Sequence, residues 1–266
     1  MTTAGSGRFR VMFKAAVKKE WKEAIRRYRL LVIIGVFLII GVLSPVSAKM
    51  LPKMMEMVAS QSKEQGFEFS YNKEPTVNDA LIQYNKNLGL LPILIVIMGM
   101  GLVAEEKIKG TAETILTKPI SRTSLLLAKF TVFLFILVMG VITGGVVCLF
   151  YTLILLGKVD IVSFAFLNVL LLFYFIPFVA VILFLSVVIK SMAGAAAAGI
   201  GAYFSLMLMG GMPYVGKYSP QGIYSVTSKI AVGMPEPAWI IPFISSVCLT
   251  IMLLVIAAAI FEKQEI

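Results

Sequence analysis

Six long apolar runs are the feature that most limits how this chain can fold. They cover residues 30–48, 85–104, 125–156, 161–189, 192–212 and 238–261. A helix needs about 20 mostly apolar residues to cross a hydrocarbon core of roughly 30 Å. In lipid, a single segment satisfies its own backbone hydrogen bonds only as a helix. The sequence therefore predicts an all-α integral membrane protein with six transmembrane helices.

The composition supports a membrane domain and excludes several kinds of enzyme. Of the 266 residues, 59% are hydrophobic and 14% are charged, whereas about a quarter of the residues in soluble domains are charged. The chain has no histidine, so histidine cannot act as a general base, a metal ligand or a pH switch. We expect two parts: a cytoplasmic interfacial helix at residues 1–29 and one six-span domain at residues 30–266.

Basic residues indicate how the chain is oriented. Nine Lys and Arg lie in the first 29 residues and five in the segment 105–129, whereas the loop 49–89 has five basic and five acidic residues. The positive-inside rule therefore places both termini and the segment after the second span in the cytoplasm of a cell that carries the protein in its plasma membrane. On this view Lys129 projects into the cytosol. The net charge of +10 then reflects this bias and contact with anionic lipid, not with nucleic acid.

Residues 8–29 have the periodicity of an amphipathic helix. Apolar residues recur at steps of three and four, and a basic stripe keeps a step of four. This pattern is typical of a helix in the cytoplasmic membrane interface. The residues expected at that interface are Arg10, Lys14, Lys18, Trp21 and Lys22. The alternative is a solvated helix packed on a partner.

Two segments resemble nucleotide-binding motifs only superficially. Residues 211–218 approach a phosphate-binding loop, but Tyr218 replaces the hydroxyl residue that would bind magnesium, and no strand precedes the segment. Residues 99–104 approach a dinucleotide fingerprint without a βαβ context. The apolar cores of the spans contain no charged residue that would serve as an ion relay. We therefore expect no catalytic residue, metal site or cofactor in this chain, and an energy source outside it.

Small and soft residues cluster in three of the spans. Gly140, Gly144 and Gly145 in the third span and the run 193–202 in the fifth allow close helix packing, within the chain or, for the fifth span, between subunits. Methionine adapts to varied apolar partners. Two roles are therefore open for a set of methionine and phenylalanine residues: packing in the core, or lining a substrate path. These residues are Met98, Met100, Phe204, Met207, Met209 and Met212.

The two longer loops differ in character. The loop 49–89 is polar and is expected to form short helices and turns. The loop 213–237 is rich in proline and glycine but carries little charge. It is expected to form a re-entrant or surface-lying pair of short helices, with its irregular backbone buried in protein.

The segment from Glu105 to Arg122 is polar and charged between two spans. Gly110 interrupts the preceding helix, Thr111 is placed to cap a new one, and Pro119 ends it. The new helix has Glu113 in its first turn and an apolar edge formed by Ala112, Ile115 and Leu116. Such a stub fits a groove on another protein, whereas a solvated connector would not need the Ile-Leu pair.

The pattern of this segment is similar to that of a known family. Glu105-Glu106, Lys109-Gly110-Thr111, Glu113, Ile115-Leu116, Pro119-Ile120-Ser121-Arg122 and Lys129 resemble the signature between the second and third spans of type-2 ABC exporter permeases. The resemblance implies that the segment is a coupling helix that docks on a separate ABC ATP-binding subunit. The docking residues it implies are Glu105, Glu106, Thr111, Ala112, Glu113, Ile115 and Leu116. It also implies that ATP and magnesium bind to that partner, that two permease copies form a homodimer or heterodimer, and that spans two and five line the path.

The function expected from these observations is that of a non-enzymatic permease subunit of an ATP-driven exporter. The apolar, Met-rich surfaces favour an amphipathic or hydrophobic cargo such as a peptide, a lipid-like molecule or a drug. One alternative is a self-sufficient channel or secondary carrier, which would work without ATP. Another is a membrane enzyme that acts on lipid, which the lack of histidine and of an acidic cluster argues against.

Overall fold

The structure is a computed structural model that describes residues 3–64, 74–108, 122–212, 214–234 and 237–264. All regular secondary structure in these ranges is helical, as the sequence predicts. The elements are α1 (Thr3–Arg26), α2 (Arg29–Glu64), α3 (Val77–Gly89), α4 (Leu91–Gly99), α5 (Ala104–Ile108), α7 (Arg122–Leu156), α8 (Ile161–Val188), α9 (Met192–Gly210), η1 (Gly216–Tyr218), α10 (Gln221–Ala231), η2 (Pro237–Trp239) and α11 (Ile240–Lys263).

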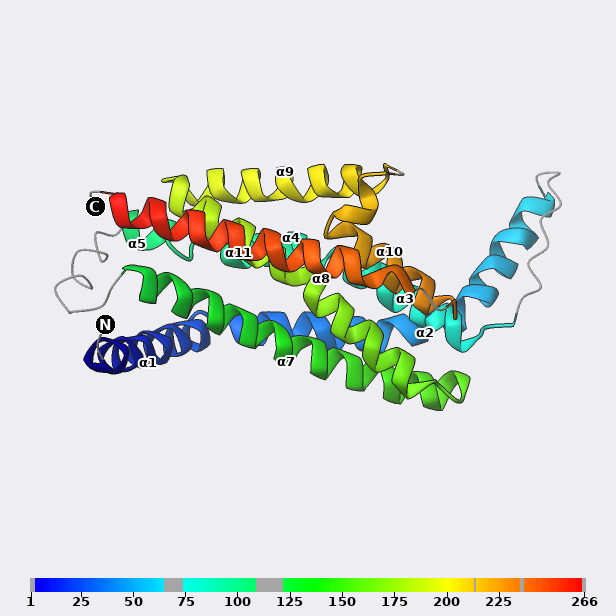
Figure 1. Ribbon diagram of the computed structural model, residues 1–266. Helices are drawn as coiled ribbons and strands as arrows, with labels where there is room; N and C mark the ends of the chain where they lie inside the picture. The colour runs from blue at the N-terminus through cyan, green and yellow to red at the C-terminus, as the bar shows by residue number, and fades with distance from the viewer. Residues whose placement is uncertain (1–2, 65–73, 109–121, 213, 235–236, 265–266) are drawn as a thin grey trace.

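Six stretches are long and apolar enough to cross a membrane, which confirms the predicted number of spans. They are Arg29–Met57, Val77–Glu106, Arg122–Leu156, Ile161–Val188, Met192–Gly210 and Ile240–Lys263. The second stretch consists of α3, α4 and α5, separated by two breaks. Figure 1 shows the long helices running roughly along one direction.

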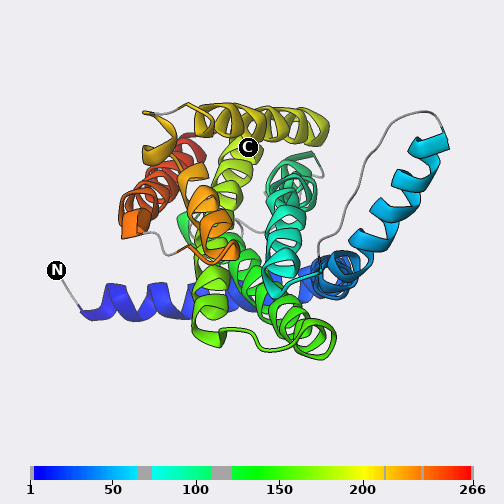
Figure 2. The ribbon, with the colours of Figure 1, turned by 90° about the vertical axis from the view of Figure 1, so that its right-hand side faces the viewer.

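Helix α8 lies at the centre of the bundle, between α7, α4, α9, α10 and α11 (Figure 2). Most of its side chains from Leu170 to Val187 are buried, and Phe175, Phe178 and Leu183 have no exposed surface. The helix is apolar all round, as expected for a span enclosed by other spans. Pro177 lies inside it and cannot donate a backbone hydrogen bond to the carbonyl of Phe173. Ser246 of α11 donates to that carbonyl instead.

Glycines bring α2 and α7 into direct backbone contact. A Cβ atom on Gly41 would lie 2.5 Å from the carbonyl oxygen of Gly144, and one on Gly144 would lie 2.7 Å from the carbonyl oxygen of Phe37. Gly140 packs in the same way on the Phe37 ring. The small residues of the third span therefore serve packing within the chain. In the fifth span, Gly199 of α9 packs against Val96 of α4.

The first of the two longer loops is partly more regular than predicted, whereas the second contains a short helix as expected. Helix α2 does not stop at the end of the apolar run but continues to Glu64, so residues 49–64 are not separate short helices and turns. The reason is that Met, Lys, Glu and Ala in this stretch favour a helix whether or not lipid surrounds it. In the loop 213–237, the short helix α10 packs against α8 and α3 and buries Ile223 and Val226, in accordance with the prediction of short helices there.

Helix α1 lies across one end of the bundle instead of along it (Figure 2). We call this the α1 end; α5, the start of α7 and the end of α11 lie there too (Figure 1). The turn from α1 into α2 is sharp, and Tyr28 within it has a left-handed backbone with φ 57°. The location of α1 in the membrane interface remains a prediction.

Candidate coupling site

In the sequence the predicted docking segment runs from α5 towards α7, and α5 and the start of α7 both lie at the α1 end. Residues 109–121, which include Thr111, Ala112, Glu113, Ile115 and Leu116, lie outside the described residues. The site is therefore built from the two elements that lead into and out of this segment. Glu105 and Glu106 are on the first of them, α5.

A serine from α8 holds the start of α5. The second span breaks after Gly99, and the chain turns through residues 100–103 before α5 begins. The Ser186 hydroxyl oxygen accepts hydrogen bonds of 2.9 Å from the N–H groups of Val103 and Ala104 and donates one of 3.3 Å to the Met100 carbonyl. Two free N–H groups at a helix start are thereby satisfied in a buried place. This contact fixes the direction in which α5 presents Glu105 and Glu106.

Lys129 is the centre of a buried ion-pair cluster. Its ammonium nitrogen lies 3.0 Å from both carboxylate oxygens of Glu20 and 3.0 Å from Oε1 of Glu106. Its side chain is 1% exposed, and the side chains of Glu20 and Glu106 are 3% and 8% exposed. The three residues come from α7, α1 and α5. Removing charges from water is costly, so a pair this deeply buried needs close partners on every side.

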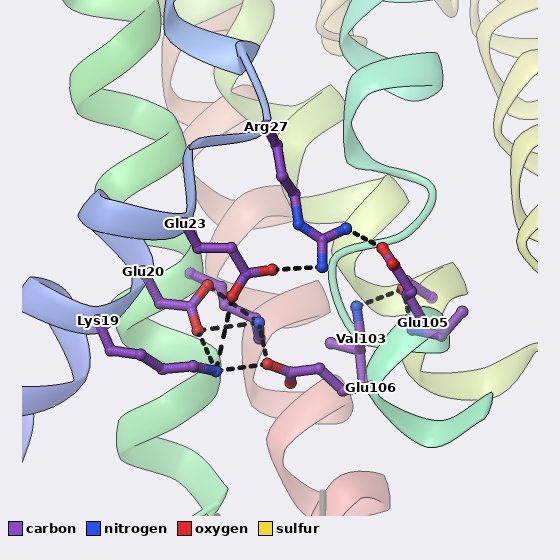
Figure 3. Close-up of polar contacts among 10 residues, drawn as sticks. Lys19, Glu20, Glu23, Arg27, Val103, Glu105 and Glu106 are labelled. Carbon is purple, nitrogen blue, oxygen red and sulfur yellow. Dashed lines mark hydrogen bonds and ion pairs between the residues drawn. The ribbon is translucent and has the colours of Figure 1, made fainter. Parts of the chain in front are cut away.

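Lys19 joins the same two carboxylates from the more exposed side. Its Nζ lies 2.6 Å from Glu106 and 3.0 Å from Glu20. Burial alone lowers the pKa of the Lys19 ammonium, but the charges of Glu20 and Glu106 outweigh this effect and raise the pKa above its ordinary value. Figure 3 shows Lys19 and Glu106 side by side, with Glu20 and Glu23 approaching from α1.

Arg27 makes a second bridge between α1 and α5. Its guanidinium group lies between Glu23, at 2.8 Å, and Glu105, with which it forms a short hydrogen bond (Figure 3). Burial opposes the charge on Arg27, yet Glu105 and Glu23 together raise its pKa. Glu105 and Glu106 thus both bind α1, and their predicted contact with an ATPase remains a prediction.

Three carboxylates of this cluster lie close enough together to suggest a cation site. Single oxygens of Glu20, Glu23 and Glu106 lie within 4.8 Å of one another. The ammonium groups of Lys19 and Lys129 already contact all three of these residues. The donor set therefore fits an internal ion-pair network better than a metal site.

The cluster was missed in the sequence because its members are distant along the chain. Lys129 was expected to project into the cytosol, and this expectation is wrong: the side chain is enclosed by α1 and α5. The error came from treating α7 as an isolated helix whose apolar run begins near residue 125. The one available signal was that Glu20 and Glu23 interrupt an otherwise basic helix.

The other predicted residues are placed as follows. On α1, Lys14, Lys18 and Lys22 are exposed, while Trp21 is half-buried and packs edge-on against Phe135 of α7 at 5.4 Å. Arg10 lies on α1, and its side chain is outside the described residues. Their binding to lipid remains a prediction.

The predicted path residues lie on two elements, α9 and the second span. Phe204, Met207 and Met209 are exposed on the second half of α9, and Met212 is exposed just beyond it. Met98 and Met100 of the second span are half-buried. Their contact with cargo remains a prediction.

Comparison with known proteins identifies the family. The family model described as "ABC-2 family transporter protein" matches residues 15–266 of this chain. This chain belongs to the ABC-2 transporter family. A search of curated proteins gave no match. Family membership makes the protein a multi-pass membrane transport subunit, of the kind that associates with an ABC ATP-binding subunit. In this ABC-2 protein, the ion-pair cluster joins α1 and α7 to α5, the helix that leads into the segment between the second and third spans.

Proposed function

We propose that this ABC-2 protein is the permease subunit of an ATP-driven exporter in the plasma membrane, with its α1 end and both termini in the cytoplasm. The observation that carries the proposal is the buried cluster around Lys129. It fixes α5, and with it the entrance to the segment that contains Thr111–Leu116, to both α1 and α7. A segment held this firmly at its base transmits force; a loose connector would not.

The mechanism follows from this connection. ATP and magnesium bind to a separate ATPase subunit, whose closure moves the docking segment. Because packed side chains and ion pairs resist deformation, the motion passes as a rigid displacement into α5 and α7. The second and third spans then shift, and the path changes from facing inward to facing outward. Two permease copies enclose this path.

An amphipathic or hydrophobic cargo is the class that suits the exposed surfaces. The second half of α9 presents Phe204, Met207 and Met209, Met212 follows just beyond it, and no ionisable side chain lies among them. Methionine-rich apolar surfaces accommodate varied partners. A peptide, a lipid-like molecule or a drug fits this surface better than a sugar or an ion.

Capture of the ATPase tests the docking role. The chain is co-expressed with its ABC ATP-binding subunit, purified from detergent, and compared with a variant that carries Ile115→Asp and Leu116→Asp. We expect the variant to lose the ATPase, because two carboxylates would have to enter an apolar groove. A control variant with Met54→Asp and Met234→Asp adds the same charge at exposed positions at the opposite end of the bundle. This control should still bind the ATPase.

A transport assay tests the energy source. The purified permease is placed in vesicles with and without the ATPase subunit. ATP-dependent accumulation of a fluorescent amphipathic peptide that requires both subunits supports the proposal. Movement of the peptide down an ion gradient with the permease alone would contradict the proposal and favour a secondary carrier.

A further inference from the structure

The exit of the docking segment is held as firmly as its entrance, but by a different helix. Helix α7 begins at Arg122, directly after residues 109–121. The guanidinium group of Arg122 donates a hydrogen bond of 3.0 Å to the carbonyl oxygen of Phe261 and a short one to the carbonyl oxygen of Gln264. It also lies over the Phe261 ring, 5.9 Å from the ring centre.

The Arg122 guanidinium group lies at the carboxyl-terminal end of α11, a position that favours a positive charge. The last carbonyl groups of a helix have no partner within it, and the aligned peptide dipoles give this end a partial negative charge. At Gln264 the backbone leaves the helix in an extended conformation. Arg122 supplies both the missing donors and the positive charge. The end of α11 is therefore capped by a residue 139 positions earlier in the sequence.

Two neighbouring contacts extend this attachment. The Thr123 hydroxyl donates a short hydrogen bond to the Glu262 carboxylate. The side-chain amide of Gln264 donates a hydrogen bond of 3.0 Å to the carbonyl oxygen of Val187 at the end of α8. The four residues Phe261–Gln264 thus connect the start of α7 with the end of α8. We call these contacts the exit clamp.

We propose that Arg122 is a positioning residue for ATP-driven transport, which fixes α11 to the exit of the docking segment so that both move as one body. The proposal rests on the proposed function, since it requires force to arrive through residues 109–121. The cluster around Lys129 carries this force to α1 and α7. The exit clamp carries it to the sixth span and, through Gln264, to the end of the central helix α8, whose Ser186 also holds the start of α5.

A purely structural cap would have a different consequence. Loss of a cap that only stabilises α11 lowers the thermal stability of the permease but leaves the transport obtained from each ATP unchanged. Loss of a positioning contact separates ATP hydrolysis from movement of the sixth span. The ratio of cargo moved to ATP hydrolysed distinguishes the two roles, because it does not depend on how much folded protein is present.

The experiment measures this ratio for the permease–ATPase complex in vesicles. We expect Arg122→Gln to lower the transport per ATP by about tenfold, the factor that corresponds to the loss of one hydrogen bond from a charged group. Arg122→Lys keeps the charge beside the carbonyl groups and should retain most of the ratio. An unchanged ratio in Arg122→Gln would overturn the proposal.

A cross-link provides a test that does not require Arg122 to be replaced. After Cys148 and Cys248 are replaced by alanine, Thr123→Cys and Glu262→Cys are introduced and joined by oxidation. Elements that move as one body tolerate this bond, so transport per ATP should stay within about twofold of the reduced protein. Transport that is blocked by oxidation and restored by reduction would overturn the proposal. Transport by the wild-type permease without the ATPase subunit would refute the proposed function itself, and the positioning role with it.

Discussion

Ser246 of α11 donates a hydrogen bond of 2.7 Å to the carbonyl oxygen of Phe173 in α8. Phe173 lies four residues before Pro177, the residue that has no N–H to offer this oxygen. Proline is tolerated inside a span when a neighbouring helix supplies the missing donor. This hydrogen bond between α8 and α11 thus uses a carbonyl oxygen that one proline leaves without its donor in the helix.

Ser246→Ala should lower the free energy of unfolding by about 1 kcal/mol, because the Phe173 carbonyl is left without a partner. The measurement is thermal unfolding of the purified permease in detergent. Ser205→Ala is the control, since the exposed Ser205 hydroxyl bonds only to its own helix. In a Pro177→Ala background the cost of Ser246→Ala should shrink, because alanine restores the N–H. An equal cost in both backgrounds would refute this account.

Lys129→Met should lower the free energy of unfolding by about 3–5 kcal/mol, because the buried carboxylates of Glu20 and Glu106 lose the cation between them. Thermal unfolding in detergent measures this loss. Lys158→Met removes the same charge at an exposed position and should change stability by less than about 0.5 kcal/mol. Adding Glu20→Met to Lys129→Met should recover part of the loss. A further fall on adding it would show that the pair is not the cause.

Gly41→Ala should destabilise the contact between α2 and α7 by about 1–3 kcal/mol, because the added methyl group meets the Gly144 carbonyl oxygen at 2.5 Å. Gly35→Ala is a matched control in the same helix, where nothing lies within 4 Å of the added atom. It should be neutral or stabilise the protein by up to about 1 kcal/mol, since alanine favours a helix. Equal melting temperatures of the two variants would contradict the close approach.

Tyr28→Gly should raise the free energy of unfolding by up to about 1 kcal/mol. The left-handed backbone of Tyr28 is strained for any residue with a Cβ atom, and glycine removes the strain. Tyr214→Gly is the control: Tyr214 is 87% exposed and does not have a positive φ. A loss of stability in both variants would mean that the Tyr28 side chain contributes more than its backbone costs.

At neutral pH and above, the attachment of α1 should change only in the alkaline range. The pKa of Lys19 is raised above its ordinary value of 10.5, so its contribution is fully present below pH 10.5 and is lost as pH rises through the higher folded-state value. In a Trp239→Phe variant, Trp21 fluorescence reports the packing of α1 on Phe135. The emission should stay constant from pH 7 to pH 10 and shift to the red only above this range. Lys19→Arg should move the shift to higher pH, and a shift near neutral pH would contradict the assignment.

The number of spans and the presence of α1 were predictable because both follow from local patterns. Length and apolarity decide whether a helix can cross a membrane, and the spacing of apolar residues decides which face of α1 is buried. The end of α2 was less predictable. The apolar run stops at residue 48, but helix propensity carries the backbone on to Glu64.

The sequence alone determined that this chain has six spans with a polar segment between the second and the third, because hydrophobic runs and helix signals act over neighbouring residues. The permease family followed from the resemblance of that segment to the signature of type-2 ABC exporter permeases. Only the tertiary structure decided that Lys129 is buried between Glu20 and Glu106, and that Arg122 caps the end of α11. These partners are 109 and 139 residues apart for the Glu20 and Phe261 contacts. Each charged group is stable where it lies only because the fold brings its partner next to it. Patterns among neighbouring residues do not reveal partners so far apart in the sequence.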